Sequence, residues 1–208
     1  MKIKPKVFII SSMEKKKPYI TIGLIITNII IFIVLEWKGN SLDAEYMMEM
    51  GAVYPEKIQV DGEYWRLITA TFMHFGFSHL LNNMVLLGTA GQILERAIGP
   101  LKYLILYLLA GVGGSTLSYV QMLHSGDYAV AAGASGAIFG IVGALLWIVI
   151  RNKGHYETLT GKGLVAMIVL CLYYGISTGG VDNWGHIGGL IGGFLIGILF
   201  YKRKKETY

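Results

Sequence analysis

Charged residues divide this chain into long segments that contain none of them. Six stretches of at least 18 residues lack Asp, Glu, Lys and Arg, and they are 18–35, 67–94, 103–126, 128–150, 163–181 and 183–201. A helix rises about 1.5 Å per residue, so roughly 20 residues cross a hydrocarbon core of about 30 Å. Backbone groups in lipid must also be satisfied within their own segment, which favours helices over strands. The pattern predicts six membrane-spanning helices with apolar cores at 19–35, 75–94, 103–122, 134–150, 163–178 and 184–201.

The composition agrees with this pattern. Of the 208 residues, 54% are hydrophobic and 15% charged, and the mean hydropathy is +0.55. These values fit a soluble surface poorly. The first apolar run is longer than the core of a signal peptide and has no good small-residue cleavage site. We therefore expect an all-α polytopic membrane protein.

The basic residues predict how the chain is oriented. If the N-terminus is cytoplasmic, fifteen of the eighteen Lys and Arg residues lie inside, and only Lys38, Lys57 and Arg66 lie outside. This bias predicts that both termini are cytoplasmic. Nine of the thirteen acidic residues then lie outside, seven of them in segment 36–66. The formal net charge of +5 is thus an orientation signal, and nucleic acid is not an expected partner.

Three parts follow from this topology. Residues 1–18 form a basic cytoplasmic segment, 19–201 a six-helix membrane domain, and 202–208 a basic cytoplasmic tail. The outer loop 36–73 mixes methionine and aromatic residues with its charges, so we expect it to be partly structured at the interface. Membrane lipid is the surrounding partner.

Polar residues inside the spans are costly in lipid and are therefore functional candidates. His79 and Asn83 lie four apart on one face of the second span, Ser135 opens the fourth, and His186 opens the sixth. These three spans run from outside to inside, which puts His79, Ser135 and His186 at a similar shallow depth. Taken alone, the pair of His79 and Asn83 is better explained by interhelical hydrogen bonding and Ser135 by packing. His186 alone is equally consistent with a buried structural histidine and a functional one. Their common depth favours one site that opens to the outer face.

A metal centre is disfavoured by the same residues. His74 and His79 are five apart, which places them on different faces of a helix, and no acidic or cysteine ligand lies at that depth. The single cysteine, Cys171, excludes a cysteine-based zinc cluster and an internal disulfide. We expect neither a metal nor a cofactor.

Glycines favour a close approach of two of the helices. Gly185, Gly189, Gly193 and Gly197 recur at every fourth position in the sixth span, as Gly136 and Gly140 do in the fourth. Small residues at this spacing allow helix backbones to approach closely, and packing alone explains most of them. Gly189 lies on the face of His186. If the opposite helix is the fourth span, the imidazole comes within reach of Ser135 as its general base.

Taken together, these motifs resemble those of the rhomboid family of intramembrane serine proteases. The resemblance covers roughly residues 19–201, and the matching motifs are Gly133-Ala134-Ser135-Gly136, His186-Ile187-Gly188-Gly189, His79-x-x-x-Asn83, Trp65-Arg66 and Glu95-Arg96. The first motif differs from the Gly-x-Ser-x-Gly elbow of soluble hydrolases, which needs a preceding strand.

The resemblance implies a role for each matching residue. Ser135 corresponds to the nucleophile and His186 to the base, and His79, Asn83 and the Ser135 amide correspond to the donors that stabilise the oxyanion. In this family an aromatic ring stacks on the histidine, and here that residue is Phe139, where many members have tyrosine. The other corresponding residues have supporting roles, and they are Gly133, Gly136, Gly189, Trp65 and Arg66.

The family implies catalysis by a dyad, without an acid. Asp182 precedes His186 by four residues, and we hypothesise that stacking alone orients the imidazole. Implied substrates are single-span membrane proteins that are cleaved near the outer end of their helix. Substrate access in the family is ascribed to the fifth span and its following loop, here 177–183, although this segment is equally consistent with a simple turn.

Two other classes remain open. An inactive relative that binds membrane clients would share the fold, although the presence of both Ser135 and His186 argues against it. A transporter also places polar groups inside membrane helices, typically near the midplane and in repeated halves, and this chain shows neither feature.

Overall fold

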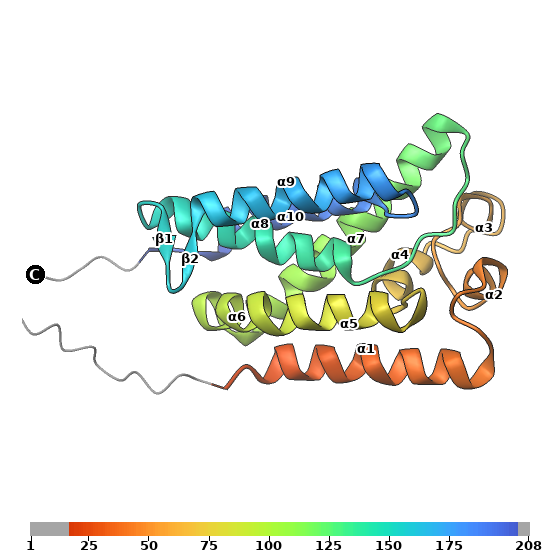
Figure 1. The fold of residues 1–208 in the computed structure, drawn as a ribbon, viewed down its shortest axis with the longest axis horizontal. Coiled ribbons are helices and arrows are strands. Elements are labelled where there is room, and N and C mark those ends of the chain that lie inside the picture. The colour runs from red at the N-terminus through yellow and green to blue at the C-terminus, as the bar shows by residue number, and fades with distance from the viewer. Residues whose placement is uncertain (1–16, 204–208) are drawn as a thin grey trace, which may run out of the picture.

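The computed structural model describes residues 17–203 and is almost entirely helical (Figure 1). Its main helices run along the long axis of the view, except for α7, which is inclined to the others (Figure 1). They are α1 (Tyr19–Lys38), α5 (Gly76–Leu86), α6 (Gln92–Ile98), α7 (Pro100–Ser125), α8 (Ser135–Arg151), α9 (Gly161–Thr178) and α10 (Asn183–Phe200). The short elements are α2 (Ala44–Glu49), α3 (Pro55–Gln59), α4 (Arg66–Thr69), η1 (Ala70–Phe72), η2 (Leu87–Gly91), β1 (His155–Tyr156) and β2 (Leu159–Thr160). Helical elements thus lie at each of the six predicted apolar stretches.

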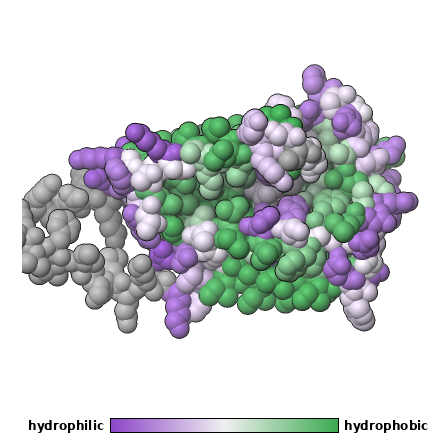
Figure 2. Space-filling view, in the orientation of Figure 1, coloured by the Kyte–Doolittle hydropathy of each residue, from purple (hydrophilic) through white to green (hydrophobic). Residues whose placement is uncertain are grey.

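The helices and the surface confirm the predicted class of all-α polytopic membrane protein. Within residues 17–203, α1, α7 and α10 are long and apolar enough to cross a membrane, and α8 and α9 are shorter apolar helices. Apolar side chains cover most of the middle of the visible face, and hydrophilic side chains gather at its two ends (Figure 2). Such a belt suits a hydrocarbon layer between two aqueous phases. The number of crossings, six, stays a prediction.

The second predicted span is not one regular helix. Between α5 and α6 the backbone forms the π-helical turn η2. Gly91 lies at its end, where an added Cβ atom would collide with the Tyr103 hydroxyl on α7 and lie 3.2 Å from the Cγ2 atom of Thr21 on α1. The absence of a side chain at Gly91 therefore lets the α5–η2–α6 segment pack closely against α1.

The start of α1 is capped from another helix. No side chain in its own first turn caps its free amides. Instead, the buried carboxylate of Glu95 on α6 accepts hydrogen bonds from the Ile20 and Thr21 amides, at 3.0 and 2.8 Å, and from the Thr21 hydroxyl at 2.7 Å. A carboxylate at a helix N-terminus is also favoured by the helix dipole. These bonds join α1 to α6.

The outer segment is built around Arg66. Its guanidinium group is almost fully buried, donates to the Ala52 carbonyl oxygen at 3.0 Å and forms an ion pair with Glu63. The Trp65 ring centre lies 4.9 Å from the guanidinium carbon. The segment holds α2, α3, α4 and η1, which lie together at one end of the helix bundle (Figure 1).

Both ends of the described chain lie at the opposite end of the bundle from α2 and α3 (Figure 1). The hairpin of β1 and β2 is also there, and its Glu157 pairs with Arg96 at 2.8 Å. Most of the predicted basic segment 1–18 and of the tail 202–208 lies outside the described residues, as do the charges that residues 1–16 and 204–208 contribute to the orientation argument.

Candidate active site

The residues before Ser135 are bound to the outer segment. Ala131 forms an isolated antiparallel bridge with Val53, with backbone hydrogen bonds of 2.8 and 3.0 Å. The Gly133 amide then donates to the Ala70 carbonyl oxygen at 2.9 Å. We call residues 131–134, which precede the candidate nucleophile Ser135, the nucleophile loop. Its position is fixed by contacts distant in sequence, which the pattern of apolar runs could not reveal.

Ser135 is the first residue of α8, in agreement with the prediction that it opens the fourth apolar stretch. The first amides of a helix have no intrahelical acceptor and carry the positive end of the helix dipole. The Ser135 hydroxyl therefore lies where a developing negative charge is stabilised. Residue 135 is half-buried, so it is neither sealed in the core nor freely exposed.

His79 lies against the nucleophile loop. A Cβ atom added to Gly133 would lie 3.1 Å from the Nε2 atom of His79 and 3.5 Å from the Ser135 Oγ atom. The imidazole of His79 and the hydroxyl of Ser135 thus flank the same point. Only glycine leaves this space open, which gives Gly133 a steric role beside its sequence motif.

Asn83 supplies an unused hydrogen-bond donor. Its side chain lies one turn beyond His79 on α5 and is 4% exposed. The Nδ2 atom has no partner within residues 17–203. A buried amide without a partner costs free energy, so such a group is a candidate for binding a ligand or a transition state.

His186 is held by an aromatic ring. Its imidazole is buried on α10 and stacks on Phe139 of α8, with 4.2 Å between the ring centres and 6° between the planes. Phe139 lies one helical turn after Ser135, so the same helix carries both the hydroxyl and the ring. Within residues 17–203 no direct hydrogen bond joins Ser135 to His186. Catalytic hydrogen bonds are often long without substrate.

Glycines bring α8 and α10 into backbone contact. A Cβ atom on Gly189 would collide with the Gly136 carbonyl group, and one on Gly193 with Gly140. On Gly197 it would lie 2.9 Å from the Cα atom of Ala144. The helix opposite these glycines of α10 is therefore α8, which was the condition for the imidazole of His186 to come within reach of Ser135.

Asp182 caps α10 and does not bond to the imidazole. Its Oδ1 atom accepts a hydrogen bond from the Gly185 amide at 2.8 Å. The Nδ1 atom of His186 has no hydrogen-bond partner in the described chain. Burial raises the pKa of Asp182, an effect that its bond to Gly185 partly offsets. This geometry supports orientation of His186 by stacking alone.

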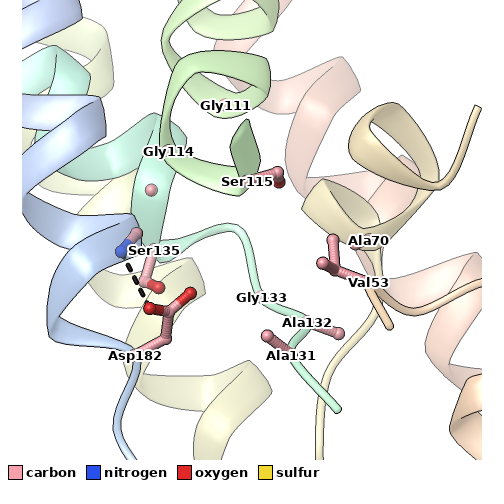
Figure 3. A pocket seen from close by; sticks show the side chains of 12 residues that line it. Val53, Ala70, Gly111, Gly114, Ser115, Ala131, Ala132, Gly133, Ser135 and Asp182 are labelled. Carbon is pink, nitrogen blue, oxygen red and sulfur yellow. Dashed lines mark hydrogen bonds between the residues drawn. The ribbon is translucent and has the colours of Figure 1, made fainter. Parts of the chain in front are cut away.

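A cavity of about 30 Å³ lies beside Ser135. Ser135 and Asp182 line it from the side of α8 and α10, Ser115 from α7, and Val53 and Ala70 from the outer segment (Figure 3). A cavity needs at least roughly 10–15 Å³ of such volume to hold a water molecule. The space next to the hydroxyl is therefore large enough to hold water.

His74 was not assigned to the site by sequence reasoning. The expectation that His74 and His79 lie on different faces of one helix is wrong, because α5 begins only at Gly76 and His74 precedes it. The two rings pack edge to face, with 5.2 Å between their centres. His74 has no exposed surface, and its Nε2 atom accepts a hydrogen bond from the Ala134 amide at 3.5 Å.

The helical bundle and this arrangement define an α-helical membrane protein with a serine and two histidines gathered at one end of the bundle. A family model, Rhomboid domain, matches residues 61–203. The chain is 39% identical over 181 residues to the rhomboid protease GluP of Bacillus subtilis (strain 168), covering 87% of this chain and 34% of that protein. The chain therefore belongs to the rhomboid family.

Two further relatives agree. Identity is 33% over 148 residues to the putative rhomboid protease YdcA of Bacillus subtilis (strain 168), covering 71% of this chain and 73% of that protein. It is 37% over 164 residues to the RHOMBOID-like protein 5 of Arabidopsis thaliana, covering 78% of this chain and 52% of that protein. The chain thus spans about a third of GluP and half of the plant protein.

Proposed function

We propose that this chain is an intramembrane serine endopeptidase that uses a Ser135–His186 dyad. The observation that carries the proposal is the packing of α8 on α10, which places the helix that begins at Ser135 against the helix of His186, with Phe139 stacked on the imidazole. Relatives that carry the name rhomboid protease support the same activity.

The first half of the reaction forms an acyl-enzyme. The Ser135 Oγ atom attacks the scissile carbonyl carbon while neutral His186 takes the hydroxyl proton. Negative charge develops on the carbonyl oxygen, and the Ser135 amide, His79 and Asn83 are the donors beside it. The C–N bond then breaks, and His186 returns the proton to the leaving amine.

Water completes the reaction. It attacks the ester carbonyl carbon and gives its proton to His186, and Ser135 leaves with that proton as the free hydroxyl. The cavity beside Ser135, which Asp182 and Ser115 also line, is a reservoir of the right size. No metal or cofactor takes part in these steps.

The substrates we propose are single-span membrane proteins, cleaved near the outer end of their helix. In the proposed topology both termini are cytoplasmic and the site opens to the outer face. This agrees with the direction of α5, α8 and α10, which begin toward the end that carries α2 and α3 (Figure 1). It also agrees with the position of Arg96 and Arg151 near the ends of α6 and α8.

An inactive protein that binds membrane clients is the second candidate. Cleavage of a reconstituted substrate decides between the two. Purified protein in liposomes is mixed with a single-span substrate, and the products are identified by mass spectrometry. The native protein should release two fragments cut near the outer end of the span, and Ser135→Ala and His186→Ala should release neither. Binding of substrate without cleavage by the native protein would favour the inactive relative.

A further inference from the structure

His74 connects the two halves of the candidate site. On one side it accepts the hydrogen bond from the amide of Ala134, the residue immediately before Ser135. On the other side its ring packs against His79, the candidate oxyanion donor. The exposed fraction of the His74 side chain is zero, so these contacts are made inside the protein.

The nucleophile loop is held by two hydrogen bonds from consecutive amides, one of which depends on His74. Two consecutive amides of the loop donate to one short segment, Gly133 to the Ala70 carbonyl oxygen and Ala134 to the His74 side chain. The first bond joins two backbone groups and so does not depend on a side chain. The second depends on a side chain that also touches His79. A shift of His74 therefore moves the loop and the donor relative to each other.

We propose that His74 is a positioning residue for the reaction, which sets the distance between the Ser135 hydroxyl and the imidazole of His79. It touches no reacting atom and acts through the Ala134 amide and the His79 ring. The inference rests on the proposed function, because it assigns His79 to the oxyanion. Misplacement of a donor by a fraction of an ångström lowers the rate without changing substrate binding.

Three substitutions separate positioning from general packing. Glutamine places a carbonyl oxygen close to where the Nε2 atom of His74 lies and can accept the Ala134 hydrogen bond. Asparagine has the same polarity but is one methylene shorter, and leucine fills the space without an acceptor. His74→Leu leaves a buried amide without a partner.

The test measures kcat, KM, the rate of inactivation by a fluorophosphonate, and thermal unfolding for each variant. We expect His74→Asn and His74→Leu to lower kcat and the inactivation rate about tenfold with KM unchanged. His74→Gln should stay within about threefold of the native protein. If His74→Leu does not fold, the comparison of glutamine with asparagine carries the test.

A second measurement checks the link to His79. In a His79→Ala background, His74→Asn should lower kcat by a smaller factor than it does alone, because the donor it positions is already gone. Asn28→Ala is the control, since Asn28 is also fully buried but lies on α1. It should lower the unfolding temperature and leave kcat of the folded protein unchanged.

Two failures are distinguishable. A native protein that neither reacts with the fluorophosphonate nor cleaves substrate overturns the proposed function and the role of His74 with it. If the native protein is active, two results would overturn the role of His74 alone. One is equal kcat values for His74→Gln and His74→Asn. The other is that His74→Asn lowers kcat by the same factor in the His79→Ala background as in the native protein.

Discussion

The helix pair α8–α10 and the neighbouring helix α9 are packed in opposite ways. Eleven residues of α8 are buried, and glycines of α10 reach the α8 backbone. In α9 the buried large side chains among the described residues are Leu164 and Ile168. The exposed ones are Val165, Val169, Leu170, Tyr173, Tyr174 and Ile176.

This difference in packing suits two different needs of the proposed reaction, a fixed geometry at the site and an opening for substrate. The proposed nucleophile and base need a fixed distance, and close backbone packing resists displacement because interiors tolerate little change in volume. A bulky substrate needs an opening, and a helix with few buried contacts separates from its neighbours at low cost. One described contact of α9 is a hydrogen bond from the Asn183 side chain to the Leu172 carbonyl oxygen, at 3.1 Å. This bond joins α9 to the α8–α10 pair at Asn183, three residues before His186.

The largest effect is expected from filling the α8–α10 contact. Gly189→Ala places a Cβ atom against the Gly136 carbonyl group, so the two helices must move apart. Overpacking of this kind costs about 1–3 kcal/mol of stability, and the displacement of His186 should lower kcat as well. Thermal unfolding and turnover measure both effects. Gly23→Ala in α1, which has open space around it, should raise stability slightly, as alanine favours a helix over glycine, and should leave turnover unchanged. Equal losses from the two substitutions would refute the comparison.

The next effect is expected at the stacked ring. Phe139→Leu keeps an apolar side chain but removes the flat face against His186. Stacked aromatic pairs contribute about 0.5–1.5 kcal/mol, so kcat should fall roughly two- to tenfold with KM unchanged. Phe139→Tyr retains the ring and should stay near the native rate. If leucine and tyrosine turned substrate over equally fast, stacking would not orient the base.

A smaller effect is expected where α9 is tied to α10. Asn183→Ala removes the bond to Leu172, and such bonds between membrane helices contribute about 0.6 kcal/mol. We expect faster hydrogen exchange of α9 amides and unchanged exchange in α8, measured by mass spectrometry. Acceleration spread evenly over both helices would mean that α9 is not the separately mobile part.

The smallest effect is expected at Asp182. Because its pKa is raised above the ordinary 3.8, the stability it contributes is complete below that pH and is lost as the pH rises through the folded-state pKa. Asp182→Asn keeps an oxygen for the Gly185 amide and removes this loss. The variant should therefore gain stability relative to the native protein as the pH is raised to neutrality, with turnover nearly unchanged. A fall in kcat as large as that of His186→Ala would show that the dyad interpretation is wrong.

Much of the fold could be predicted from the absence of charge. A long run without charges predicts a helix because backbone groups in lipid must form hydrogen bonds within their own segment. Each predicted stretch holds helical structure. The turn η2 could not be predicted from the pattern of charges, and Gly91 at its end packs against Tyr103 and Thr21 on two other helices. The pairing of Ala131 with Val53 joins segments far apart in the sequence, and periodicity carries no signal for it.

The candidate site shows the same limit. Ser135 and His186 could be identified because polar groups are costly in lipid and these two were predicted at a similar depth. The glycine spacing indicated which face of α10 is packed. His74 was missed because helical spacing was applied to a residue that precedes its helix. The hydrogen bond between the Ala134 amide and His74 depends on the path of the nucleophile loop, which only the three-dimensional structure shows.

The most direct test of the central claim is to map a fluorophosphonate adduct on the intact protein in liposomes. If the α8–α10 contact holds a nucleophile and its base, peptide mass spectrometry should place the adduct on Ser135. His186→Ala should abolish it, and Asp182→Asn should leave it in place. An adduct on Ser115, the other serine that lines the cavity, or one that persists in Ser135→Ala, would contradict the claim.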